Sequence, residues 1–414
     1  MSLSKPPKDR RFDASLIPAS PQLDDLAHRA IERAQAVEAR VRSRRRADQR
    51  TFERAVIGAV TNLVYAELEG ASRRVMVSLS KRDLSSARRP APFLTENFRD
   101  TVRLLAAAGI ADLDLGVKGV DESRQSTIGV GHWLADELAR LDVRFEHIGR
   151  DPELLPPAVI LKSTKVCGTA TFLPLPDSPE ARRLIAEMRV INERLASAVI
   201  DWTGEPIDLS RRYLRRVFNE GSLSLGGRMW GGFWMPLSKD QRLQHLRIDD
   251  EPVASLDFAH MGVTLGYSVA KTDPPPGDLY AIPGTGGSRQ GVKKVLNALL
   301  CSSRVPERFP VNTKAYFPAG WKFADIREAI ERHHPALVHL FGTAQAFTQQ
   351  YLESTVMVRS LLALSEEGVV GLPIHDALLV GASNVSLAKD ILEESFSEVT
   401  GVVGKVDIES VLPL

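Results

Sequence analysis

The stretches "SLDFAHMG" (255–262) and "LPIHDALLV" (372–380) each place one aspartate at the end of an apolar run. The first predicts an apolar strand that stops at Asp257 and continues into a helix. The second predicts two apolar strands joined by a tight turn, with His375 and Asp376 at the bend. On neighbouring strands, two carboxylates can together bind a pair of Mg²⁺ ions about 4 Å apart, as in enzymes of phosphoryl transfer. We therefore expect a two-metal site at Asp257 and Asp376, with Mn²⁺ as the alternative ion.

The segment between the two acids carries a basic helix face. A strand-terminal aspartate alone more often forms a turn or a cap than a metal site. The residues between the two aspartates therefore determine whether a metal site is the better interpretation. The sequence "GSRQGVKKVLNALLCSSR" (287–304) predicts an amphipathic helix whose valines and leucines pack inward. Arg289 and Lys293, four residues apart, project from one face, and Lys294 lies next to them. This face can bind a triphosphate; the alternative is a solvated helix surface.

The order of these three features resembles motifs A, B and C of family A DNA polymerases and single-subunit phage-type RNA polymerases. The resemblance covers residues 250–382, about a third of the chain. It implies an α+β fold with a polymerase-like palm and abbreviated fingers. It also implies that the two aspartates bind metal, that the basic helix face binds the triphosphate, and that the histidine before the second aspartate belongs to the site. The residues concerned are Asp257, Asp376, His375, Arg289, Lys293 and Lys294.

Two positions in these motifs bear on the nucleotide. Where the family has a tyrosine followed by glycine, this chain has Cys301 and Ser302. Five residues after the first aspartate, the DNA polymerases have a glutamate that blocks the ribose 2′-OH and the RNA polymerases have glycine. Here the residue is Gly262, which favours ribonucleotides. The resemblance thus implies that Gly262 and Cys301 lie at the nucleotide.

A segment before motif A combines arginines, glycine pairs and large aromatic residues (211–242). Aromatic rings can stack on bases while arginines contact phosphates, so this segment can hold template or primer. The alternative is a β-hairpin with core aromatics. With "PPPGDLYAIPG" (274–284) and "HHPALVHLFG" (333–342), it also resembles small polymerase-like proteins encoded on bacterial mobile elements. The candidate nucleic-acid contacts are Arg215, Arg216, Arg228, Trp230 and Trp234.

Positive charge gathers near the N-terminus. The formal net charge is +1, but residues 1–50 hold 12 Lys and Arg against 7 Asp and Glu. The run "RVRSRRR" (40–46) alone has five arginines, including Arg44 and Arg45, and such a run suits phosphates. The alternative is a solvated basic helix face.

We expect three parts in the chain. Residues 1–22 lack apolar periodicity and predict a flexible arm. Residues 23–170 predict a mainly helical region that resembles a winged-helix module; a small helical domain that packs on the rest is the alternative. Residues 171–414 would form the palm and fingers, with the boundary near 165–178, after a proline-marked connector that begins at Asp151.

Composition narrows the class of protein. The 43% apolar residues suffice for a packed core, and the two cysteines are too few for a disulfide framework. No apolar stretch is long enough to span a bilayer, and the N-terminus lacks a signal peptide's apolar core, so we expect a cytoplasmic protein without a membrane partner.

The sequence therefore predicts a template-directed nucleotidyltransferase, either a primase or a small RNA or DNA polymerase. Its partners would be a nucleic-acid template or primer and nucleoside triphosphates. The alternative from another class is a non-catalytic nucleic-acid-binding replication or regulatory factor on a degenerate palm scaffold.

Overall fold

The computed structural model describes residues 9–40, 42–70, 73–81, 83–85, 91–117, 124–283, 285–286 and 288–409. The chain divides into two compact units. Unit 1 comprises Met1–Pro156 and Pro206–Ser210, and unit 2 comprises Pro157–Glu205 and Arg211–Leu414. The first division falls inside the proline-marked connector, earlier than the boundary at 170 that we expected. The short return of the chain into unit 1 has no signal in the sequence.

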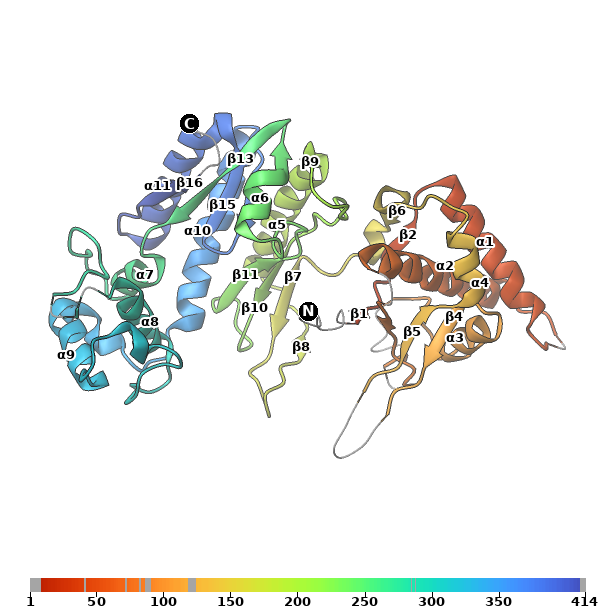
Figure 1. The fold of residues 1–414 in the computed structure, drawn as a ribbon, viewed down its shortest axis with the longest axis horizontal. Helices are drawn as coiled ribbons and strands as arrows, with labels where there is room; N and C mark the ends of the chain where they lie inside the picture. The colour runs from red at the N-terminus through yellow and green to blue at the C-terminus, as the bar shows by residue number, and fades with distance from the viewer. Residues whose placement is uncertain are drawn as a thin grey trace. The chain divides into compact units, whose positions relative to one another are not determined.

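Unit 1 is a helical core with two small sheets (Figure 1). Strands β1, β3, β5 and β4 form one sheet in that order, and β2 pairs with β6. Helix α2 is buried along most of its length and ends before Gly70, as the sequence predicts. The elements are β1 (Arg10–Arg11), β2 (Leu16–Pro18), α1 (Pro21–Ala36), α2 (Arg46–Glu69), β3 (Val75–Met76), α3 (Phe98–Ala107), β4 (Ala111–Asp114), β5 (Thr127–Val130), α4 (His132–Leu138) and β6 (Ile148–Arg150).

The start of the chain differs from the flexible arm that we expected. Residues 9–22 form β1, β2 and the first turn of α1. Leu16 and Ser15 are each only 1% exposed, and the Asp13 backbone N–H donates to the Asn62 side chain at 2.8 Å. This segment therefore belongs to the core of unit 1 because its few apolar residues pack on α2. The rest of the expected arm, residues 1–8, lies outside the described residues.

Unit 2 is a mixed α+β structure, which confirms the predicted class. One sheet has the order β14-β15-β13-β12-β9 with β16 also paired to β13, and a second has the order β11-β10-β7-β8 (Figure 1). The elements are β7 (Val159–Lys162), β8 (Phe172–Leu173), α5 (Pro179–Ser197), β9 (Ile200–Trp202), β10 (Arg215–Phe218), β11 (Gly226–Trp230), α6 (Lys239–His245), β12 (Leu246–Ile248), β13 (Glu251–Phe258), α7 (Met261–Val269), α8 (Arg289–Cys301), α9 (Phe323–His333), α10 (Ala346–Glu366), β14 (Leu372–Ile374), β15 (Ala377–Gly381), α11 (Val385–Thr400) and β16 (Val406–Glu409).

Strand β13 is the central strand of the larger sheet. It pairs antiparallel with β15 on one side and with β12 and then β16 on the other. Helix α11 packs on β13, β15 and β16, and α10 packs on α11. The ring of Phe258 meets Phe396 of α11 at 4.9 Å, while the neighbouring Asp257 faces the opposite side and is exposed. The end of β13 thus presents a carboxylate on the face that α11 leaves uncovered.

Helices α7, α8 and α9 form a second core in unit 2. The valines and leucines of α8 are fully buried there, as its periodicity predicts. Ser288 caps this helix, because its hydroxyl accepts a hydrogen bond from the Gly291 backbone N–H at 3.3 Å. The basic residues of α8 therefore lie on its outer surface. Among the described residues, we find no helix with the length and apolar character needed to cross a membrane.

Candidate active site

The structure brings the two predicted aspartates to one place. Asp257 pairs in register with Ala377, and Asp376 is the residue directly before Ala377. His375 and Asp376 form the two-residue turn between β14 and β15, so the hairpin predicted from the sequence is confirmed. His375 adopts φ 56°, in the left-handed region that this tight turn requires. Both carboxylates line a single cavity of about 220 Å³ in unit 2.

The charge of Asp376 is close enough to affect the ionisation of Asp257. Burial of the surroundings and the Asp376 charge raise the pKa of Asp257 to about 6, although Lys293 opposes this shift. The Asp257 side chain is itself exposed on the cavity side, so the strands around it, and not full burial, limit its hydration. Within the described part of the chain, neither of these two carboxylates has a hydrogen-bond or ion-pair partner. A cation would relieve this repulsion.

The donor set fits a hard divalent cation. Mg²⁺ is commonly bound by one or two carboxylates, with waters and substrate phosphates completing the shell. The described residues contain no cluster of three or more His, Cys, Asp or Glu side chains arranged to hold a metal. Asp257 and Asp376 would therefore need water or other oxygen ligands to complete the shell of a bound Mg²⁺.

Helix α8 places one row of side chains along the cavity. Lys293, Asn297 and Cys301 follow each other at intervals of four residues and all line it. Cys301 is exposed to the cavity, but the desolvation by its surroundings still raises the pKa of its thiol, although Arg228 opposes this shift. Lys294 lies off this row, because its ammonium donates to the Tyr316 hydroxyl at 3.2 Å. Of the three predicted cations on α8, Lys293 is the one that reaches the cavity.

Arg289 lies at the first position of α8, outside the group of cavity-lining side chains. Its Nε donates to Asp278 at 2.6 Å. Gly262, predicted to lie at the nucleotide, does line the cavity. A Cβ at this position would stand 3.1 Å from Oδ1 of Asn297, so the amide of Asn297 fills the space next to the glycine.

A buried ion pair that the sequence analysis missed joins β11 to α10. Arg228 donates through Nε and Nη2 to the two carboxylate oxygens of Glu353, each at 2.7 Å. Glu353 is 5% exposed, and its burial raises its pKa although Arg228 opposes the shift. Both residues line the cavity with Gln349. Gln349 and Glu353 are polar residues four apart on one face of α10, and both are buried.

The predicted nucleic-acid contacts in β10, in β11 and just after β11 separate into exposed and buried residues. Trp230 is 46% exposed and its ring lies 4.9 Å from His375, while Arg215 is its half-buried register partner. Trp234 is fully buried and donates its indole N–H to the Pro373 carbonyl at 3.0 Å. Such a ring cannot stack on a base unless the core opens, so the core-aromatic alternative describes Trp234.

Arg216 is also a core residue. It is 1% exposed, and its guanidinium donates to the Gly227 carbonyl at 3.2 Å and to the Thr355 hydroxyl at 2.9 Å. Burial lowers its pKa to about 10, although Glu187 nearby opposes the shift. Arg216 thus ties β10 to α10 and is not available to phosphates.

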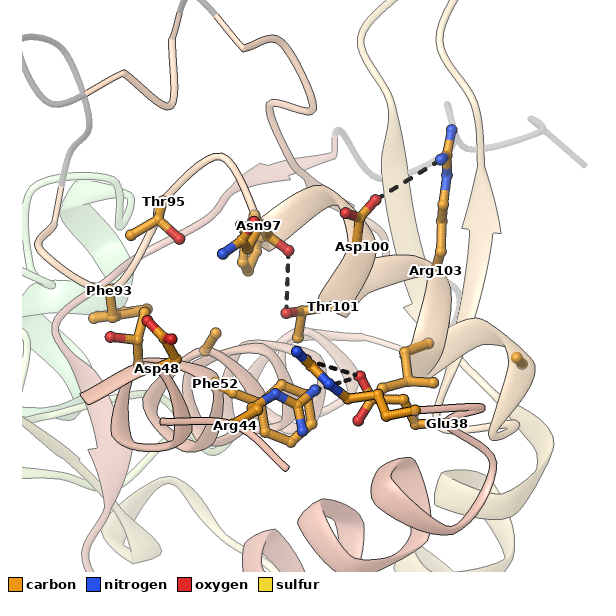
Figure 2. A pocket seen from close by; sticks show the side chains of 16 residues that line it. Glu38, Arg44, Asp48, Phe52, Phe93, Thr95, Asn97, Asp100, Thr101 and Arg103 are labelled. Carbon is orange, nitrogen blue, oxygen red and sulfur yellow. Dashed lines mark hydrogen bonds and ion pairs between the residues drawn. The ribbon is translucent and has the colours of Figure 1, made fainter. Parts of the chain in front are cut away.

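In unit 1, Arg44 lines a second cavity. Figure 2 shows this cavity of about 660 Å³ between α2 and α3. The Arg44 guanidinium stacks on the Phe52 ring at 3.7 Å and donates to Glu38 at 2.6 Å. Arg45 is exposed at the start of α2. The cavity also contains Asp48, Asp100 and Arg103, so its lining has mixed charge.

No family model matches the chain, and no curated protein sequence matches it. Among solved structures, it is similar to the POL domain of Pol1 from M. smegmatis in complex with DNA primer-template and dNTP. The TM-score is 0.31 at 10% sequence identity, over 95% of this chain and 66% of that chain. A similarity of this size does not establish a shared fold.

Proposed function

We propose that unit 2 is the palm and fingers of a template-directed nucleotidyltransferase. The observation that carries the proposal is the meeting of Asp257, Asp376 and Lys293 in one cavity. Two carboxylates that have no partner among the described residues, together with one lysine, form the charge pattern that a metal-bound triphosphate requires. The order of these residues along the chain, which resembles polymerase motifs A, B and C, supports the same assignment.

The charged residues of the cavity then have distinct roles. Asp257 and Asp376 would hold two Mg²⁺ ions, which activate a 3′-hydroxyl and stabilise the pyrophosphate leaving group when bound. Lys293 offsets the charge of the triphosphate. The Arg228–Glu353 pair fixes a guanidinium near the turn of Asp376, and the exposed Trp230 offers a ring for a base.

Gly262 bears on which sugar the site accepts. Gly262 has no side chain that could clash with a ribose 2′-OH, so a ribonucleotide product is favoured and the protein is a primase or a small RNA polymerase. In unit 1, the exposed Arg42, Arg45 and Arg46 would bind the phosphates of the template or primer. Replacing these three arginines by glutamine should weaken nucleic-acid binding and flatten its dependence on salt.

The decisive experiment is a nucleotide-extension assay with the full chain, Mg²⁺ and labelled nucleotides on primed and unprimed DNA and RNA templates. Incorporation that depends on template sequence supports the proposal. Binding of nucleic acid without any incorporation, in Mg²⁺ and in Mn²⁺, would instead favour the non-catalytic factor. Cys301 and Ser302, where polymerases have tyrosine and glycine, are the observation that favours this second candidate.

The same assay tests the sugar assignment. Wild type should use ATP at least as well as dATP, and Gly262→Glu should penalise ATP selectively, since exclusion from a close-fitting pocket costs several kcal/mol. Gly262→Ala is the control, because its Cβ requires only a small shift of Asn297. A wild type that strongly prefers dATP would contradict the assignment.

A further inference from the structure

The segment between α7 and α8 contains a carboxylate that contacts the first residue of α8. Asp278 accepts hydrogen bonds from the Tyr280 backbone N–H at 2.9 Å and from Arg289 Nε at 2.6 Å. Its Oδ1 also lies 2.7 Å from Nε2 of His260. Since the loop's own backbone orients the carboxylate, Asp278 is a fixed acceptor and not a freely rotating surface acid.

The proton count decides which contacts of His260 are hydrogen bonds. Its Nε2 is 2.7 Å from Asp278 and 3.1 Å from Nη2 of Arg289. A ring nitrogen cannot donate to a carboxylate and accept from a guanidinium at the same time. Burial raises the pKa of Asp278, but the Tyr280 N–H and Arg289 lower it further, so the carboxylate is ionised. Nε2 therefore carries the proton and donates to Asp278, and Nη2 of Arg289 keeps its own protons.

Asp278 and His260 lie at one edge of the Arg289 guanidinium, and the other edge has no partner among the described residues. Nε of Arg289 faces Asp278, whereas Nη1 has no hydrogen-bond partner within the residues that the structure describes. The end of the guanidinium can still donate to a phosphate. Because three donors share the Asp278 carboxylate, little of its negative charge remains to repel an anion.

The ring of Tyr280 connects Arg289 to the cavity. Tyr280 is 2% exposed and lines the cavity beside Lys293. The Arg289 guanidinium carbon lies 5.3 Å from the ring centroid, and Nζ of Lys293 lies 6.0 Å from the same centroid. A triphosphate that reaches Lys293 is therefore within reach of Arg289.

We infer that Asp278, with His260, is a positioning residue that holds Arg289 so that its free edge meets the triphosphate. The inference rests on the proposed function. An unrestrained arginine at the exposed first turn of α8 would lose rotamer entropy on binding, which weakens the binding. Asp278 orders the side chain in advance, so this loss no longer opposes binding.

The test is calorimetric titration of the full chain with Mg·ATP in the absence of nucleic acid. Asp278→Ala should weaken binding about 5–10-fold, and Arg289→Ala by at least as much, the range of a charge-assisted contact to phosphate. The double variant should bind no more weakly than Arg289→Ala alone, since Asp278 acts through Arg289. Asp278→Asn, which keeps the acceptor oxygen, should recover part of the affinity. Asp273→Ala removes an exposed acid from the same segment and is the matched control.

Three outcomes would overturn the inference. Tighter binding by Asp278→Ala would make Asp278 a competitor of the triphosphate. An unchanged affinity of Asp278→Ala for Mg·ATP would show that Asp278 has no role in binding. A loss that persists in the Arg289→Ala background would show a structural effect, which thermal unfolding of each variant would reveal. A wild type that binds no Mg·ATP contradicts the proposed function itself, and is distinguishable because no variant is needed to see it.

Discussion

Each unit contains a pair of aspartates from distant parts of the chain, and the two pairs are treated in opposite ways. In unit 1, Arg150 lies between the carboxylates and donates to Asp13 at 2.8 Å and to Asp208 at 2.5 Å. In unit 2, Asp257 and Asp376 share a cavity, and no hydrogen bond or ion pair with a described residue neutralises them. One pair is satisfied by the protein, and the other has no partner among the described residues.

The pKa directions of the two pairs differ accordingly. Burial raises the pKa of Asp13, but the Ser15 hydroxyl and Arg150 outweigh it, so its pKa is lowered. The pKa of Asp257 is raised to about 6 by burial and by Asp376. A carboxylate that costs free energy when ionised at neutral pH is retained where binding or catalysis uses it. The two pairs have the same number of acids, and they differ in whether the protein supplies a partner for the carboxylates.

The largest effect is expected from variants that remove one carboxylate of the Asp257–Asp376 pair in unit 2. Asp257→Asn and Asp376→Asn should each lower nucleotide incorporation by several orders of magnitude, because each removes a ligand for ions that supply several kcal/mol of transition-state stabilisation. Nucleic-acid affinity should stay close to wild type, since phosphate contacts remain. Extension rates and filter binding measure the two quantities.

Asp250→Asn is the matched control for these variants, because it makes the same change in the exposed turn at the other end of β13. It should leave incorporation unchanged. Near wild-type incorporation by either Asp257→Asn or Asp376→Asn would remove the palm assignment.

The second largest effect is expected from a variant that removes the guanidinium between Asp13 and Asp208 in unit 1. Arg150→Met should destabilise the protein by about 3–5 kcal/mol, because it leaves two carboxylates without their shared cation. Urea unfolding measures the free energy. Arg140→Met is the control, since Arg140 is exposed and its ion pair with Glu137 should contribute at most about 1 kcal/mol. Equal stability of the two variants would show that the Arg150 network adds nothing.

The third effect concerns the cation that faces the unsatisfied pair. Lys293→Ala should weaken nucleotide use by about 1–3 kcal/mol in kcat/KM, the range of a charged hydrogen bond to phosphate. Lys294→Ala should have a much smaller effect, because Lys294 contacts Tyr316 and does not reach the cavity. Loss of template affinity with an unchanged nucleotide KM would place this helix face on nucleic acid instead.

The smallest effect is a pair of opposite pH dependences, measured by unfolding in the absence of divalent ions. A lowered pKa stabilises the fold above the usual carboxyl range, so Asp13→Asn should cost about 1–2 kcal/mol at pH 7 and less as pH falls below about 4. A raised pKa has the reverse sign: stability falls as pH rises from about 4 to about 6. Asp257→Asn should therefore stabilise the protein at pH 7, by about 1 kcal/mol or less since water screens this exposed group. The same sign for both variants would contradict the comparison.

Local patterns in the sequence determined the elements that carry the candidate site. The apolar periodicity of α8 predicted both its buried face and the outward direction of its basic residues. The apolar arms on either side of His375 and Asp376 predicted the hairpin, and the strand before Asp257 predicted its position at a strand end. These features follow from side-chain spacing within a few residues, which the chain specifies without its fold.

Only the tertiary structure decided which polar side chains are satisfied. Glu353 pairs with Arg228 across 125 residues, and Asp208 returns to unit 1 to meet Arg150. Trp234 resembles an exposed stacking residue in sequence but lies fully inside the core. The burial of a side chain and its hydrogen-bond partners depend on elements that are far apart in the chain. An arginine in a given sequence pattern can therefore either contact a ligand or join two elements of the core. The sequence alone thus determined where the chemical groups stand, and the packing of distant segments determined which of them remain free to act.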